Sequence, residues 1–245
     1  MRRFIAIVFM ALAGFGAALA HAQQRYAVIS LIGDRMEIAY AKGVEGQPVD
    51  RIERRYIALD DSRIDRYTLL AANEVIKKVV PGPDPVLLQA FDRSYFEVSA
   101  GTGAVIEWMR QLVKDAKPRV THAIVITKIQ YEGVPAIQKA FVGGGTLEGV
   151  GFFVGREAPP KGMDPNSGGP AFLSPFAYFQ VTLVDLSTGK VVREEKGTAS
   201  TALSATNTDS GNAWDTLSAE RKLQTIIDLV KRELEIVLPK VLKGA

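Results

Sequence analysis

The residue types that could carry out catalysis are few in this sequence. The 245-residue chain has no cysteine and two histidines, His21 and His122, and His21 lies in an N-terminal segment that we expect to be removed. Zinc sites built from histidine and cysteine are therefore excluded. A nucleophile, base and acid triad would have to use His122 as its base. His122 begins an apolar segment, where a packed or surface histidine is the commoner finding, so the sequence predicts no catalytic residue, no metal site and no cofactor.

An acidic residue and a pair of glycines mark two places where a ligand could bind. Gly33-Asp34 follows the first apolar segment, and the carboxyl end of an interior strand is a usual place for chemistry in α/β folds. Gly101-Thr102-Gly103 stands where a helix is expected to begin, so its free N–H groups could hold an anion. The alternatives are that Asp34 belongs to a turn and that Thr102 is an ordinary helix cap.

The segment from Phe176 to Thr198 has the pattern of a β-hairpin. Apolar residues recur at every second position from Ala177 to Leu183, which is typical of a strand with one buried face. The segment Asp185-Leu-Ser-Thr-Gly189 supplies the turn, because Asp and Ser can hydrogen-bond their own backbone and glycine tolerates a positive φ. The return strand soon becomes Arg193-Glu-Glu-Lys196, as expected for a strand at a sheet edge.

A long loop from Glu157 to Pro175 precedes the hairpin. It is longer than most structureless connections in compact domains, and such loops tend to be lids, binding loops or disordered. We expect recognition here before catalysis. The candidate partner-binding residues are Phe172 and Leu173 at the end of the loop, and Arg193 and Glu195 on the edge of the hairpin.

The remaining segments predict an α/β fold. Strands are expected at Tyr26–Ile32, Arg35–Tyr40, Arg51–Asp61, Val120–Tyr131 and Gly149–Val154. The first helix is expected to carry Leu69, Ala72, Ile76 and Val79 on one face and to stop at Pro81, and the second to run from Thr102 with Val105, Met109, Leu112 and Ala116 on one side. The order strand, helix, strand suggests a crossover between neighbouring parallel strands.

The second half of the chain predicts an antiparallel section and a long final helix. No helical pattern lies between Gly149 and the hairpin, and Ala199 to Asn212 is expected to be an exposed connector. The last helix has Ser218 as its cap and an apolar stripe formed by Leu223, Ile227, Val230, Leu234, Val237 and Val241. We therefore expect a mixed sheet flanked by helices, with an antiparallel hairpin in the C-terminal half and a long C-terminal helix.

The N-terminus predicts export. Arg2 and Arg3 precede an apolar run that ends in Ala20-His-Ala22, which is the pattern of a secretory signal peptide over residues 1–22. Cleavage after Ala22 would leave residues 23–245 as a single α/β domain, periplasmic or secreted, without a membrane span. This mature chain has 28 basic and 27 acidic residues. A nearly neutral surface gives no electrostatic reason to expect nucleic acid as a partner.

The hairpin also carries a family resemblance. Phe179 to Glu194, with Asp185, Thr188, Gly189 and Val191-Val192, and more loosely Ala123 to Ile129, resembles the periplasmic domains of the curli-secretion lipoprotein and penicillin-binding-protein activator group. The resemblance implies a non-enzymatic accessory in cell-envelope assembly whose partner is another envelope protein. The chain lacks the lipid-anchoring cysteine of that group. The alternative is a periplasmic hydrolase or small-molecule-binding protein with a pocket near Asp34 and Thr102.

Overall fold

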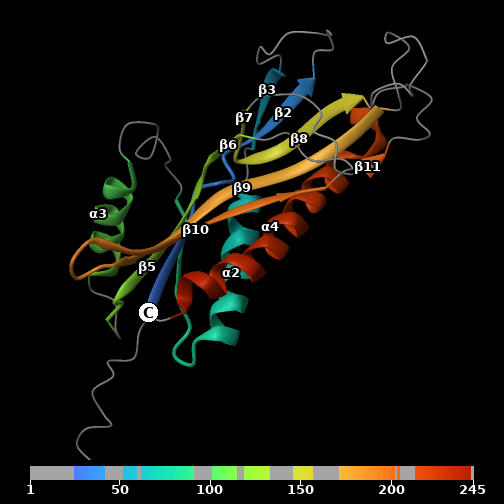
Figure 1. The fold of residues 1–245 in the computed structure, drawn as a ribbon. Coiled ribbons are helices and arrows are strands. Elements are labelled where there is room, and N and C mark those ends of the chain that lie inside the picture. Colours follow the sequence, from blue (N-terminus) through green and yellow to red (C-terminus); the bar gives the residue numbers. More distant parts are fainter. Residues whose placement is uncertain are drawn as a thin grey trace, which may run out of the picture.

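The protein is an α/β fold built on one mixed sheet. The computed structural model describes residues 25–41, 52–59, 62–90, 101–114, 119–132, 146–156, 171–201, 203–204 and 213–243. In this part of the chain, a nine-stranded sheet has helices on both faces, and a separate two-stranded hairpin packs against it (Figure 1). The expected fold class is confirmed. The proposed signal peptide lies outside the described residues.

One part of the sheet is parallel. Strand β1 (Tyr26–Ser30) lies between β4 (Val86–Leu88) and β5 (His122–Lys128), and both neighbours run parallel to it. Helix α2 (Arg63–Val79) precedes β4, and α3 (Gly101–Val113) lies between β4 and β5. The two helices pack on opposite faces of these strands. The parallel pairing expected for the strand, helix, strand order is therefore confirmed.

Strand β9 (Ala171–Asp185) joins this part to the rest of the sheet. Val181 pairs with Ile126 of β5 and with Glu195 of β10 (Lys190–Ser200), whereas Ala177 pairs with Val150 of β8 (Val150–Arg156) and with Ala199 of β10. Because a strand has only two edges, β5 and β8 must lie end to end along one edge of β9, with β10 along the other. Beyond β8 follow β2 (Arg35–Ala41) and β3 (Ile52–Ala58).

Tyr178 lies where these two parts of the sheet meet. Its N–H donates to the Gly149 carbonyl at 2.7 Å, and its carbonyl accepts from the N–H of Ile129 at 3.3 Å. Ile129 follows β5 and Gly149 precedes β8, and Gly149 has a φ of 66°. The backbone therefore stays hydrogen-bonded across the junction, and the left-handed conformation at Gly149 is one that glycine adopts without steric cost.

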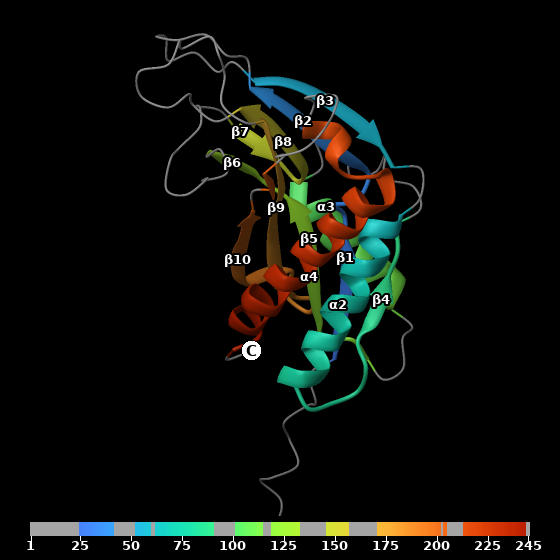
Figure 2. The ribbon, with the colours of Figure 1, turned by 90° about the vertical axis from the view of Figure 1, so that its right-hand side faces the viewer.

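The core has three clusters of buried side chains. On one face, α2 and α4 (Ala219–Leu242) lie side by side across the sheet and cover Val28, Ile124 and the odd-numbered residues Ala177 to Leu183 (Figure 2). On the other face, α3 covers Ala27 and Val125. The third cluster is aromatic and lies against the hairpin of β6 (Gln130–Glu132) and β7 (Thr146–Glu148), with Leu147, Phe153, Phe172, Phe176 and Tyr178.

This arrangement corrects one expectation about β9. The side from Ala177 to Leu183 is buried, as predicted, but Tyr178 and Thr182 on the opposite side are buried too. A strand is solvated on one face only where nothing covers that face, and here α3 and the β6–β7 hairpin do so. A strand that alternates polar and apolar residues can therefore lie in the middle of a sheet.

The buried faces of the helices agree with the predicted apolar stripes except at a few residues. In α4 all six predicted stripe residues are buried, and the Ser218 hydroxyl accepts from the N–H of Arg221 at 3.3 Å, as expected for a cap. Val79 of α2 and Leu112 of α3 are exposed, contrary to expectation, whereas Ile106 and Val113 complete the buried face of α3.

No helix among the described residues combines the length and apolar character that crossing a membrane requires.

Two segments expected to be irregular are partly strand. Residues 171–175 belong to β9, so the expected loop ends earlier than Pro175, and residues 157–170 lie outside the described part. Pro175 can be accommodated in β9 although it has no N–H to donate. Its carbonyl accepts from the N–H of Thr201, and the carbonyl and nitrogen of one strand residue point to the same side, which here is the break between β10 and β11 (Leu203–Ser204). Ala199 and Ser200 belong to β10, and the remainder of the connector is described only at 201 and 203–204.

A buried carboxylate fixes the loop that follows β1. Asp65, in the first turn of α2, accepts hydrogen bonds at one oxygen from the hydroxyl of Ser30 (2.6 Å) and from the N–H groups of Ile32 (3.0 Å) and Gly33 (3.1 Å). A Cβ at Gly33 would lie 2.9 Å from the backbone nitrogen of Asp65. Close approach of the loop to α2 therefore requires both the glycine and the aspartate.

We expect Tyr178 to make the protein sensitive to alkali. Burial raises the pKa of Tyr178 to about 12, although a hydrogen bond with Ser200 opposes the shift. The unfolded phenol has a pKa of about 10, so between these values the unfolded state loses a proton that the folded state keeps, and the free energy of unfolding falls as pH rises. The free energy of unfolding at the upper of these two pKa values should be about 3 kcal/mol lower than at neutral pH.

Urea unfolding at several alkaline pH values, with Tyr178→Phe beside the wild type, measures this contribution. The variant should lose less stability than the wild type between the two pKa values, because it has no phenol at this position. Equal losses in the two proteins would show that another group is responsible.

Candidate functional site

The turn of the β9–β10 hairpin is held by its first residue. One carboxylate oxygen of Asp185 accepts from the hydroxyl of Ser187 at 2.6 Å and from its N–H at 2.7 Å. These hydrogen bonds lower the pKa of Asp185 to about 2. The Gly189 N–H donates to the Asp185 carbonyl at 2.7 Å, and Gly189 has a φ of 71°. The turn predicted from the sequence is confirmed.

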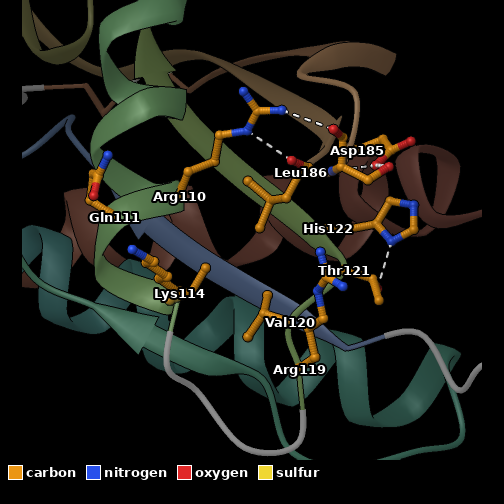
Figure 3. Close-up of a pocket in the computed structure, with 11 residues that line it drawn as sticks. Arg110, Gln111, Lys114, Arg119, Val120, Thr121, His122, Asp185 and Leu186 are labelled. Atoms are coloured by element: carbon orange, nitrogen blue, oxygen red, sulfur yellow. Dashed lines mark hydrogen bonds between the residues drawn. The ribbon is translucent and has the colours of Figure 1, made fainter.

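This turn forms one wall of an open groove of about 820 Å³ (Figure 3). The last turns of α3 form the opposite wall, and the start of β5 lies between them. Arg110 of α3 joins the two walls, because its Nε donates to the Leu186 carbonyl at 2.7 Å and its Nη2 donates to the Ser187 carbonyl at 3.1 Å. The shape of the groove is therefore fixed by hydrogen bonds as well as by packing.

Most of the charged side chains that line the groove are basic. Lys114 comes from the end of α3, and Arg119 comes from the segment before β5; both are exposed. Among the described residues, neither side chain has a hydrogen-bond or ion-pair partner. Asp185 is the one carboxylate that lines the groove in this part of the chain, and its hydrogen bonds belong to the turn. The groove therefore carries an excess of positive charge.

Serine, histidine and aspartate all line the groove, but not as a catalytic triad. The Ser187 hydroxyl bonds to Asp185 and not to His122, and Nδ1 of His122 lies 2.9 Å from the Thr121 hydroxyl. That hydroxyl also lies 3.3 Å from the Arg25 carbonyl, so it joins β5 to the start of β1. Burial lowers the pKa of His122, which keeps the ring neutral at pH 7, although the charge of Asp185 opposes the shift. A triad needs the base hydrogen-bonded to its nucleophile.

The expected partner-binding residues on β10 have different environments. Arg193 donates through Nη1 to the carbonyls of Lys240 (2.9 Å) and Lys243 at the end of α4. Its guanidinium therefore caps a helix of its own chain, where a cation is favoured. Glu195 is half-buried and pairs with Val181. One nitrogen of the exposed Arg193 is thus engaged within the protein, and its role in partner binding stays a prediction.

Phe172 and Leu173 are not surface residues. Both lie near the start of β9 and are buried, Phe172 against Phe153 with ring centroids 5.9 Å apart. They were expected at the end of a loop because the sequence before them is rich in glycine and proline. In the structure they fill the core on opposite faces of β9, Leu173 towards α4 and Phe172 in the aromatic cluster. They stabilise the fold and offer no surface to a partner in this conformation.

The expected ligand-binding residues lie in two separate segments of the fold. Asp34 makes an ion pair with Lys128, at the end of β5. Gly101, Thr102 and Gly103 begin α3, so Thr102 lies inside the first turn and not before it, and Gly103 is exposed. Neither the groove beside the hairpin nor the smaller hollow next to β3 is lined by Asp34 or by Gly103, and a ligand-binding role for the expected residues stays a prediction. No described cavity supports the alternative of a pocket near Asp34 and Thr102.

A group of charges around Glu37 escaped prediction from the sequence. Glu37 of β2 is buried, and its carboxylate contacts Nε of Arg54 at 3.2 Å and accepts from the N–H of Glu148 at 2.7 Å. Burial raises the pKa of Glu37, and these two contacts oppose the shift. A hollow of about 270 Å³ lies beside it, lined also by Tyr56, Gln130 and Thr146.

The contacts of this group indicate a structural role. Arg54 also donates to the Thr146 carbonyl at 2.9 Å, so the group links β2, β3 and β7. Both oxygens of Glu37 contact partners from its own chain, which is typical of an ion-pair network as well as of some catalytic sites. The sole sign of this charged group in the sequence was an acidic residue, Glu37, within the expected strand Arg35–Tyr40. No residue near Glu37 in the sequence identified its partners.

The fold and the groove define an α/β protein with an open, basic surface hollow, and comparisons with known proteins add little. No protein-family model matches the sequence, and no curated protein sequence matches it. A solved structure of a candidate neuraminyllactose-binding hemagglutinin homologue from Helicobacter pylori is similar with 10% identity and a TM-score of 0.34, over 91% of this chain and 89% of the other. A hypothetical protein from Chlamydia trachomatis is similar with 10% identity and a TM-score of 0.29, over 86% and 96%.

Proposed function

We propose that the chain is an exported binding or accessory protein of the bacterial cell envelope, which acts through contact with another envelope protein and without catalysis. The observation that carries the proposal is the exposed start of β10. Val191 and Val192 follow the hairpin turn with 47% and 46% of their surface exposed. They are β-branched apolar side chains side by side on the outermost strand of the hairpin, where a partner can bury them.

The rest of β10 is protected against edge contacts, which singles out this short stretch. At the far end of the strand, the N–H of Thr198 donates to the Glu233 carboxylate of α4 at 3.1 Å. Arg193 is engaged with the end of α4, and the pairing with β9 is irregular between Val191 and Arg193. Bulges, charges and covering helices are the usual means by which edge strands avoid unspecific pairing. We infer side-chain contact with Val191 and Val192 and not addition of a strand.

Two further observations support a role in binding. Ser187, His122 and Asp185 do not form a nucleophile, base and acid triad, because the Ser187 hydroxyl bonds to Asp185 and Nδ1 of His122 lies beside the Thr121 hydroxyl. The segment around the turn is also the one that resembles the curli-secretion lipoprotein and penicillin-binding-protein activator group. In that group the implied role is accessory, and the expected signal peptide is consistent with it.

Site-specific photo-crosslinking in cells tests the proposal. A photoreactive residue at Val192 should form a crosslink to one envelope protein, and Val191→Asp should reduce its yield at least fivefold, because a charged group cannot be buried in an apolar contact. The matched control is the same photoreactive residue at Ile236 of α4, which is 50% exposed. Absence of a crosslink at Val192, or the same product at both positions, would contradict the proposal.

Export can be checked in the same cells. The mass of the purified mature protein should correspond to a chain that begins at Gln23, and the protein should be released with the periplasmic fraction. An uncleaved chain in the cytosol would contradict the proposed location in the cell envelope.

A further inference from the structure

We propose that the groove between α3 and the hairpin turn binds a small amphiphilic anion, with a carboxylate or phosphate at one end and a short apolar body. This ligand site goes beyond the protein contact proposed for Val191 and Val192. The proposal depends on the unpartnered cations, the shape of the groove and the way its walls are held.

The cations come from two different elements that line the groove. Lys114 is at the end of α3, where a positive charge is favoured by the helix dipole. That effect does not account for Arg119, which precedes β5 and extends from the floor of the groove (Figure 3). Both side chains are exposed and without a partner among the described residues. An anion between them would interact with two charges that nothing else in this part of the chain neutralises.

The nearby acidic groups are already engaged. Asp185 accepts three hydrogen bonds from Ser187 and Thr188 within the turn. Glu107, one turn back on α3, accepts from the Gln111 amide at 3.1 Å and lies 3.7 Å from the guanidinium of Arg110. Neither carboxylate contacts Lys114 or Arg119. Three cations and one carboxylate line the groove, so it keeps a net positive charge that an anionic ligand can meet.

The shape and the floor of the groove suit an apolar body. A volume of about 820 Å³ lies within the range of small-molecule sites. Val113, Val120 and Leu186 line the groove, and the aliphatic stems of the lysine and arginine side chains add apolar surface to it. A fully hydrated inorganic ion would leave this surface unused, whereas a short acyl chain would cover it.

The walls are pre-organised, which lowers the cost of binding. Arg110 is a positioning residue, because two of its nitrogens bond to the carbonyls of Leu186 and Ser187 and hold the turn at a fixed distance from α3. Gly189 lies beneath the same guanidinium, where a Cβ would be 3.4 Å from its nitrogens. A ligand would therefore meet a groove that already has its bound shape.

Octanoate is a suitable probe, because it has one carboxylate and a short acyl chain. Titration of the ¹⁵N-labelled mature protein, followed by amide chemical shifts, should show saturable binding at residues 110–114, 119–122 and 185–188. Octanol and octyltrimethylammonium test the need for the negative charge, and inorganic phosphate tests the need for the apolar body. Each should bind at least tenfold more weakly than octanoate.

The double variant Lys114→Glu with Arg119→Glu should weaken octanoate binding at least tenfold. Lys78→Glu with Arg232→Glu is the matched control, since both residues are exposed on other helices, and it should bind octanoate as the wild type does. A thermal melt of each variant shows whether it is folded. Single substitutions Lys114→Gln and Arg119→Gln, each expected to weaken binding two- to fivefold, provide a second measurement if the double variant fails to fold.

Several results would overturn the proposal. Equal binding of octanol and octanoate would show that the charge has no role, and equal binding of phosphate would show the same for the apolar body. Unchanged octanoate affinity in the Lys114 and Arg119 variants would place the site elsewhere. Vesicles of phosphatidylglycerol distinguish a free ligand from a lipid surface: binding to vesicles without binding of free octanoate would contradict a groove for a soluble amphiphile.

Discussion

Replacement of Gly151 by alanine is expected to lower the free energy of unfolding by about 3 kcal/mol or more. Gly151 lies in β8, where it pairs with Glu37 of β2 and with Phe176 of β9. A Cβ at this position would lie 2.0 Å from the carbonyl oxygen of Glu37 and 2.8 Å from the ring of Phe176. The first contact is with backbone in the middle of a sheet, so neither strand can move aside without breaking its own hydrogen bonds.

Urea unfolding followed by circular dichroism measures this loss. Gly103→Ala is the control, because Gly103 is exposed on α3 and a Cβ there would meet no atom within 4 Å. That change should leave stability unaltered or raise it by up to about 1 kcal/mol, since alanine is the better helix former. An unfolding midpoint for Gly151→Ala equal to that of the wild type would show that β2 and β8 are further apart than described.

The second large effect is expected at Asp65. Its replacement by alanine leaves the Ser30 hydroxyl and the N–H groups of Ile32 and Gly33 without their acceptor in a buried place. Each unsatisfied buried donor costs about 1 to 3 kcal/mol, so we expect a total loss of about 4 kcal/mol. Asp65→Asn should cost less, because the amide oxygen can still accept.

The control for this prediction is Asp228→Ala on the exposed face of α4. Asp228 accepts a hydrogen bond from Gln224 at 2.8 Å, and its loss should cost less than about 1 kcal/mol. Comparable losses at Asp65 and Asp228 would mean that water satisfies the loop after β1 when the carboxylate is removed.

The elements that the sequence predicted are those whose signals are local. The hairpin turn depends on Asp185 and Gly189, four residues apart in the chain, and the buried stripe of α4 follows directly from its 3.6-residue period. The strand assignments were also right where apolar residues were continuous, as in β1 and β5. In each of these cases the residues that determine the structure lie within one element.

Prediction from the sequence failed where the burial of a residue depends on partners far away in the chain. Tyr178 and Thr182 alternate with apolar residues as surface residues would, yet both are buried, Tyr178 in the aromatic cluster against the β6–β7 hairpin. Glu37 and Glu148 are 111 residues apart, and Asp65 lies 35 residues from Ser30. No periodicity within a segment reveals such pairs.

The same reason explains the candidate site. Arg110, Lys114, Arg119 and the turn at Asp185 meet only because α3 packs beside the end of the hairpin. Composition suggested the segment at Leu173 as a binding loop, whereas its residues belong to the core. The turn was correctly predicted as a turn, but its role as a wall of a groove required the arrangement of α3.

The position of β9 late in the chain has a consequence for biosynthesis. Within the nine-stranded sheet, the two parts are joined by this strand, which ends at Asp185. As the polypeptide emerges from the ribosome, β1, β2, β5 and β8 are all complete before the segment that joins them exists. One edge of β5 and one edge of β8 therefore stay unpaired until β9 is made, and chaperones that hold extended apolar segments can bind the nascent chain during this period.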